Sequence, residues 1–119
     1  MSLSLVRVAG WLLVAGIILL SVLPGPDRPH SGAPGHFEHL VAYLLASIVL
    51  TLGYPSHPAR IALLSLLVTL SGALELLQLM IPGRTGELAG FVGSSAGALI
   101  GLIAISLLSG RQRTRATLS

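Results

Sequence analysis

Four long apolar segments, separated by short joints rich in proline and glycine, make up most of the chain. They cover about residues 3–23, 36–54, 59–81 and 87–108. Each approaches the ~20 residues with which an α-helix crosses the ~30 Å hydrocarbon core of a bilayer. Because lipid offers the backbone no hydrogen bonds, such segments must satisfy their own peptide groups and are expected to be helical. The pattern predicts an all-α integral membrane protein with four transmembrane helices.

The composition supports a protein that faces lipid. Hydrophobic residues make up 53% of the 119 residues and charged residues only 9%, whereas a soluble domain carries about 25% charged residues. The absence of cysteine excludes disulfides, thiolate metal ligands and thiol nucleophiles. No basic patch lies beside aromatic residues, so no nucleic-acid partner is predicted. We expect one domain over residues 1–110 in a lipid bilayer, followed by a disordered basic tail over residues 111–119.

The first segment resembles a secretory signal, since Arg7 precedes a long apolar core. Its exit, SVLPGPD, lacks the small-x-small pattern of a cleavage site, and the core is long for a signal peptide. We therefore interpret it as an uncleaved first transmembrane span.

The arginines predict the orientation of the chain, because cytoplasmic flanks of membrane helices are enriched in basic residues. Arg28 and Arg84 fall on one side of the predicted membrane. The other side holds five: Arg7, Arg60, Arg111, Arg113 and Arg115. We expect both termini in the cytoplasm, with Trp11 and Tyr54 near the inner interface.

Polar residues interrupt the start of the second segment, in the stretch GHFEHLVAY. His36, His39 and Tyr43 are spaced i, i+3, i+7 and share one helix face. Glu38 precedes His39 and points about 100° away from it.

The third segment carries a second polar face, formed by Ser71, Glu75 and Gln78 at i, i+4, i+7. At ~1.5 Å per residue, His39 and Gln78 each lie about 5 Å below the segment ends, and Tyr43 and Glu75 about 10 Å below them. Since the two helices run antiparallel, we predict that His39 lies opposite Gln78 and Tyr43 opposite Glu75.

Several functions are compatible with these residues. A buried acid costs ~3 kcal/mol at the centre of a membrane helix, so it faces protein or water and marks a functional site by default. The cluster either binds a ligand, lines a small transporter or only fixes helix register. His39 with Glu38 or Glu75 as an orienting carboxylate also suggests a hydrolase or transferase. The HxxH spacing of His36 and His39 is a weak metal motif, and no metal or cofactor is predicted.

The fourth segment has a strip of small residues that predicts close helix packing. Gly93, Gly97 and Gly101 form GxxxGxxxG, and Gly90 with Ser94 extends the small surface beside it. The partner of this strip is another helix of the chain or a second copy in a homo-oligomer.

Three stretches, HLVAY, ELLQLMIPGR and SSAGALIG, resemble the VanZ-like family over about residues 34–101. The family consists of small bacterial membrane proteins, and its founding member is associated with resistance to teicoplanin. The resemblance implies a multi-pass protein of the bacterial cytoplasmic membrane and the cell envelope. Because no serine lies in a nucleophile-elbow sequence, we expect a binding role rather than an enzyme.

Five positions match the polar pattern of the family: His39, Tyr43, Glu75, Gln78 and Arg84. The resemblance therefore suggests a site near the outer leaflet for a polar or anionic group of a lipid headgroup or cell-wall precursor. Arg84 is expected to hold a phosphate or carboxylate at its rim.

The chain departs from the family pattern at four positions. The family usually has Asp-Lys where this chain has Gly35 and His36, and an Asp and an Asn where it has Gly90 and Ser94. The fourth helix therefore lacks its usual polar side chains. Either His36 and Glu38 compensate, or the site is reduced and resistance does not transfer.

Overall fold

The computed structural model describes residues 2–23, 35–81 and 88–118, the last six of these by their backbone alone. These residues form four helices, α1 (Leu3–Val22), α2 (Gly35–Gly53), α3 (His57–Gln78) and α4 (Leu88–Leu118). All four are long and apolar enough to cross a membrane. The predicted all-α architecture with four membrane-spanning helices is confirmed.

Local sequence signals explain where α3 begins and ends. Ser56 caps its start by accepting a hydrogen bond from the Ala59 amide at 3.4 Å, and Pro58 suits the first turn because it has no amide hydrogen. At the other end, Met80 and Ile81 donate to carbonyls three residues back, at 2.9 and 3.2 Å. Such tight turns close a helix, so α3 ends at Gln78, three residues earlier than predicted.

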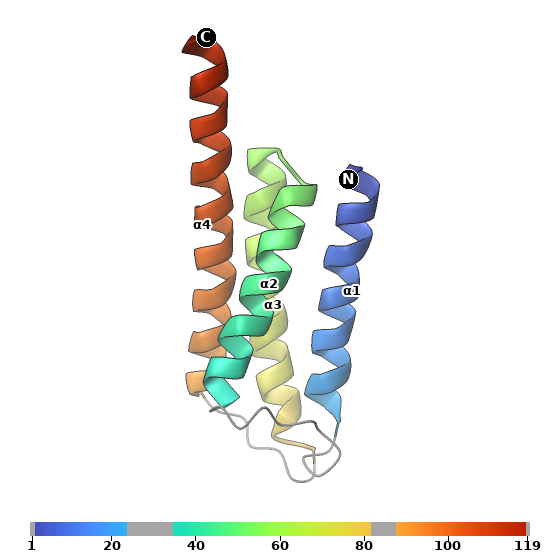
Figure 1. Cartoon of the computed structure of the whole chain (residues 1–119). Coiled ribbons are helices and arrows are strands. Elements are labelled where there is room, and N and C mark those ends of the chain that lie inside the picture. The colour runs from blue at the N-terminus through green and yellow to red at the C-terminus, as the bar shows by residue number, and fades with distance from the viewer. Residues whose placement is uncertain (1, 24–34, 82–87, 119) are drawn as a thin grey trace.

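The helix α4 is longer than predicted. It has 31 residues and continues through the segment 111–118, which we expected to be a disordered tail. Neither glycine nor proline, the residues that most often end a helix, follows Gly110. The arginines, Gln112 and Ala116 are good helix formers, so nothing in the sequence stops the helix at residue 110. The extension projects beyond the other three helices (Figure 1).

The helices form one bundle in which α2 is central. It packs most extensively on α4 and next on α1, while α3 also packs on α4. Within the described ranges, α1 makes contact with α2 and α3 but not with α4. Both chain ends lie at one end of the bundle (Figure 1), as two antiparallel helix pairs require. We call this the Arg60 end and the opposite one the His39 end.

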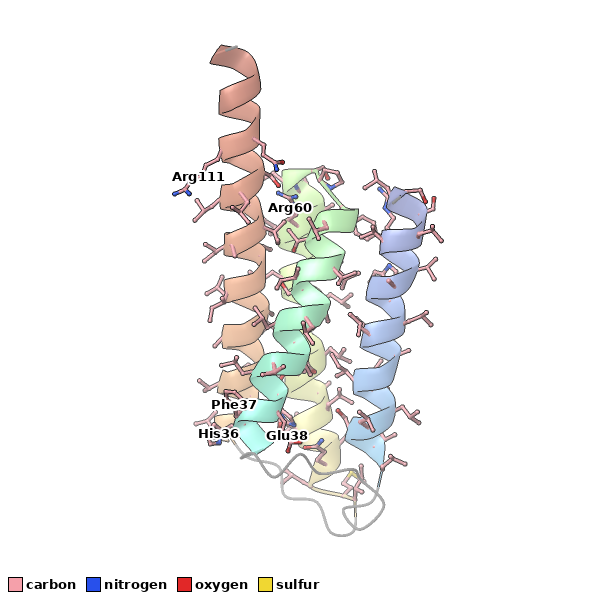
Figure 2. All side chains as sticks on the ribbon, viewed as in Figure 1. His36, Phe37, Glu38, Arg60 and Arg111 are labelled. Atoms are coloured by element: carbon pink, nitrogen blue, oxygen red, sulfur yellow. The ribbon has the colours of Figure 1, made fainter. Side chains whose placement is uncertain are left out.

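Large apolar side chains point outward, which is the reverse of a soluble bundle. Leu12 and Leu76, for example, are 66% and 70% exposed, and side chains made of carbon project outward from both edges of the bundle in the view of Figure 2. The interior is narrow and includes Ala46, Leu50, Leu67 and Ala98, each almost fully buried. A continuous apolar surface of this kind fits a lipid bilayer.

The glycine strip of α4 packs against α2 of the same chain. A methyl group on Gly93 would lie 2.5 Å from the carbonyl oxygen of His36, and one on Gly97 would meet the backbone of Leu40 and Leu44. At Gly101 it would lie 2.9 Å from the Ser47 side chain. The strip is therefore occupied within the chain, and a homo-oligomer through these glycines would require separating α2 from α4.

Arg60 joins three helices at its end of the bundle. Its Nε and Nη2 atoms donate to the carbonyls of Tyr54 and Thr51, each at 3.1 Å, and Nη1 donates to Ser106 Oγ at 3.4 Å. The side chain is buried. Carbonyls in the last turn of a helix lack partners in that helix and favour a cation. Arg60 therefore stabilises the end of α2, a role that arginine counting alone did not identify.

Candidate functional site

The central feature of the His39 end is a contact between His39 of α2 and Glu75 of α3. The imidazole Nδ1 lies 3.3 Å from the carboxylate Oε1. This distance allows charge attraction when the imidazole is protonated, although Nδ1 lacks the alignment of a hydrogen bond. The side chains are 21% and 12% exposed. The pair is thus mostly enclosed by protein and still reachable from outside.

Gly90 of α4 covers one side of the His39–Glu75 pair. A methyl group on Gly90 would lie 2.5 Å from Glu75 Oε1 and 3.0 Å from His39 Nδ1. The first contact is too close to be tolerated without movement of the carboxylate. Gly90 is therefore in direct reach of both ionisable groups, and its lack of a side chain makes room for them.

A layer of hydroxyl groups lies one helical turn further into the bundle. Tyr43 follows His39 by four residues, Ser71 precedes Glu75 by four, and Ser94 follows Gly90 by four, so each continues the face of the residue above it. All three are buried. The Tyr43 hydroxyl lies beside Ser71, yet neither Ser71 Oγ nor Ser94 Oγ makes an aligned hydrogen bond to a described residue. We call these three side chains the hydroxyl layer.

The predicted pairing of His39 with Gln78 is wrong by about one helical turn. His39 meets Glu75 instead, while Tyr43 lies beside Ser71 and is also within electrostatic reach of Glu75, its predicted partner. The prediction counted depth from residue 81, whereas α3 ends at Gln78. A shift of three residues corresponds to about 4.5 Å along the helix, which is enough to change partners.

Gln78 has a different partner from the one predicted. Its Nε2 donates to the carbonyl of Ser21 at 3.1 Å, and the side chain is buried. This bond ties the end of α3 to the end of α1. Gln78 therefore lies close to Glu75 in the sequence, but its side chain bonds to α1 instead of α2.

The remaining predicted site residues are only partly placed. His36 is exposed and Glu38 half-buried, both in the first turn of α2. Figure 2 shows them at the opposite end of the bundle from Arg60. Arg84 lies outside the described residues. Among the residues that the structure describes, no three histidine or acidic side chains are arranged to hold a metal ion.

A longer polar row on α2 was missed by sequence reasoning. His39, Tyr43, Ser47 and Thr51 follow one another at intervals of four residues. Ser47 and Thr51 are almost completely buried, and Ser47 Oγ donates to the carbonyl of Ala98 at 2.6 Å. The constant spacing of these four residues was available in the sequence and could have revealed the row.

The fold and the site together define a four-helix membrane-spanning bundle with a partly exposed ionisable pair between α2, α3 and α4 near one end. No family model, curated protein or solved structure matches the chain.

Proposed function

We propose that this protein is a VanZ-like binding protein of the bacterial cytoplasmic membrane. Its His39 end takes up the polar headgroup of an envelope lipid or a lipid-linked cell-wall precursor. Both termini lie in the cytoplasm in this proposal, which places the His39–Glu75 pair in the outer half of the membrane. The resistance function of the founding family member is not part of the proposal, because Gly90 and Ser94 replace two polar family residues.

The observation that carries the proposal is the partial exposure of the His39–Glu75 pair. An ionisable pair within a membrane is costly and persists where it faces protein partners or a ligand. This pair offers a donor and an acceptor to a molecule that approaches from the His39 end. Hydroxyl and amide groups of a headgroup match it better than a bare anion, because Glu75 would repel an anion. In the proposal, Arg84 holds the phosphate of the same ligand.

The hydroxyl layer supports the same proposal. A buried hydroxyl without a partner costs ~1–3 kcal/mol, and Ser71 and Ser94 have no aligned partner among the described residues. Both hydroxyls lie directly beneath the pair. They are therefore able to donate to a polar group that enters the bundle beside His39 and Glu75.

Native mass spectrometry of the purified protein with a polyprenyl-diphosphate-linked sugar tests the proposal. We expect Glu75→Gln, His39→Gln and Arg84→Ala each to weaken binding about tenfold or more, since each removes a charged or strongly polar contact. Thr69→Ala is the matched control, because Thr69 is exposed on the same helix as Glu75. Wild-type binding by Glu75→Gln with a lowered melting temperature would instead assign the pair a structural role.

A second candidate function, a membrane-embedded hydrolase or transferase, is favoured by the geometry of the imidazole. Glu75 faces Nδ1 of His39, the arrangement in which a carboxylate orients a histidine that acts as a base through its other nitrogen. A buried serine of the hydroxyl layer would be the nucleophile. Turnover of the lipid-linked sugar by wild type, lost in His39→Gln and in Ser71→Ala, would establish this alternative.

A further inference from the structure

Arg7 of α1 is held rigidly at the Arg60 end by two contacts with the end of α2. Its Nε donates to the carbonyl of Gly53 at 2.7 Å, and its guanidinium carbon lies 4.5 Å from the centre of the Tyr54 ring. Tyr54 is itself fixed, because its hydroxyl accepts a hydrogen bond from Trp11 Nε1 at 2.9 Å. The aromatic ring and the carbonyl thus determine the direction in which the guanidinium points.

The two terminal nitrogens of Arg7 have no acceptor among the described residues. Nε is the only nitrogen of the group that donates to one of them. The described acids, Glu38 and Glu75, both lie at the His39 end, so neither can offset this charge. The half-buried guanidinium therefore presents a fork of N–H donors that is already oriented and has no protein counter-charge in the described structure.

The surroundings of Arg7 are those of a membrane interface. Leu3, Arg7 and Trp11 follow one another at intervals of four and share a helix face, and both Leu3 and Trp11 are exposed. Arg7 lies four residues, or about 6 Å, from the start of α1. This depth corresponds to the polar zone between the hydrocarbon core and water, where tryptophan and tyrosine concentrate.

We propose that Arg7 binds the phosphate of an anionic phospholipid in the leaflet at the Arg60 end. The terminal nitrogens hold two phosphate oxygens in the forked geometry that guanidinium favours, and Trp11, about one helical turn deeper, contacts the acyl chains. A lipid is the preferred source of this phosphate, because an apolar helix face surrounds the fork. This site is separate from the His39 end and does not depend on the function proposed there.

Trp11 is the only tryptophan in the chain, so its fluorescence reports directly on this site. The experiment uses the full chain in bilayers and compares quenching by phosphatidylglycerol and by phosphatidylcholine, both with brominated acyl chains. We expect phosphatidylglycerol to be preferred about fivefold, as for one basic side chain at an anionic surface. The preference should vanish in Arg7→Gln and fall by more than half in Arg7→Lys, which keeps the charge but not the fork.

Arg111→Gln is the matched control, because Arg111 is exposed near the same end and the substitution removes the same charge (Figure 2). It should leave the preference unchanged. Equal quenching by both lipids in wild type would overturn the proposal. An equal loss in Arg7→Gln and Arg111→Gln would also overturn it, since diffuse charge would then explain the preference. Circular dichroism of each variant confirms that the helices are retained.

A second arm separates a lipid from a soluble phosphate. Inorganic phosphate and glycerol phosphate are added to protein in phosphatidylcholine bilayers, and Trp11 emission is recorded. We expect no change at millimolar concentrations. An Arg7-dependent change in emission would show that the fork binds soluble phosphate and would overturn the assignment to lipid.

Discussion

Among the glycines of α4, Gly90 is the one whose added methyl group would meet the polar pair first. It places the backbone of α4 against both His39 and Glu75, so the space available to the carboxylate depends on the missing side chain. The atom that an added methyl group would meet first, Oε1, ends a flexible side chain and can move. A larger residue at position 90 should therefore change the geometry of the pair more than it changes the stability of the bundle.

We predict that Gly90→Ala separates the Glu75 carboxylate from His39 with only a small loss of stability. Alanine favours the helix by up to ~1 kcal/mol over glycine, which offsets part of the strain. Imidazole NMR shifts of His39 in micelles should move, and the melting temperature should change little. Gly16→Ala is the control, since a methyl group there has no atom within 4 Å. Unchanged His39 shifts in Gly90→Ala would contradict the prediction.

At the scale of residues, the helical spacing predicted which polar side chains share a helix face. It did not predict all of the residues that they contact. His39, Tyr43 and Glu75 are indeed near one another. Their pairing depends on where α3 ends, and helix ends cannot be located to within a turn from apolar composition. The role of Gly90 depends on the rotation of α4, which only the packed structure provides.

At the scale of elements, the contact between α2 and α4 is a contact between two backbones. The obstacles at Gly93 and Gly97 are main-chain atoms of His36, Leu40 and Leu44, which cannot move without displacing the helix. Small residues at four-residue intervals allow this approach. The sequence predicted the interface from the glycines of α4 but could not identify its partner.

We predict that Gly97→Ala destabilises the bundle far more than Gly90→Ala. The added methyl group would overlap the backbone of Leu40 and push α2 away from α4, at a cost of ~1–3 kcal/mol for overpacking. Thermal unfolding in detergent, followed by circular dichroism, should show a melting temperature several degrees below that of Gly16→Ala. Equal melting temperatures for the two variants would mean that α2 and α4 are further apart than described.

At the scale of the whole molecule, the sequence predicted the number of helices, their approximate limits and their common membrane-spanning character. These follow from length and hydropathy, because an apolar segment long enough to span the bilayer satisfies its backbone hydrogen bonds by forming a helix. The helical extension of α4 was not predicted, since its polar composition suggested a tail. The central position of α2 was also not predictable, because it results from the combined packing of three partners.

The position of both termini at one end can be tested with single cysteines, since the chain has none of its own. Ser2→Cys and Gln112→Cys lie at exposed positions near the Arg60 end, and Gly35→Cys lies at an exposed position at the other. In intact bacterial cells, a membrane-impermeant maleimide should label Gly35→Cys only. Lysed cells should show labelling of all three. Labelling of Ser2→Cys and Gln112→Cys from opposite sides would contradict the fold.

The central place of α2 has a consequence for how the protein is made. A ribosome delivers α2 well before α4, yet α4 is the helix on which α2 packs most extensively. Until α4 enters the membrane, Ser47 of α2 has no acceptor at Ala98, and the α4 side of the His39–Glu75 pair stays uncovered. Biosynthesis therefore passes through an intermediate in which this polar flank of α2 faces lipid, and the insertion of α4 covers it.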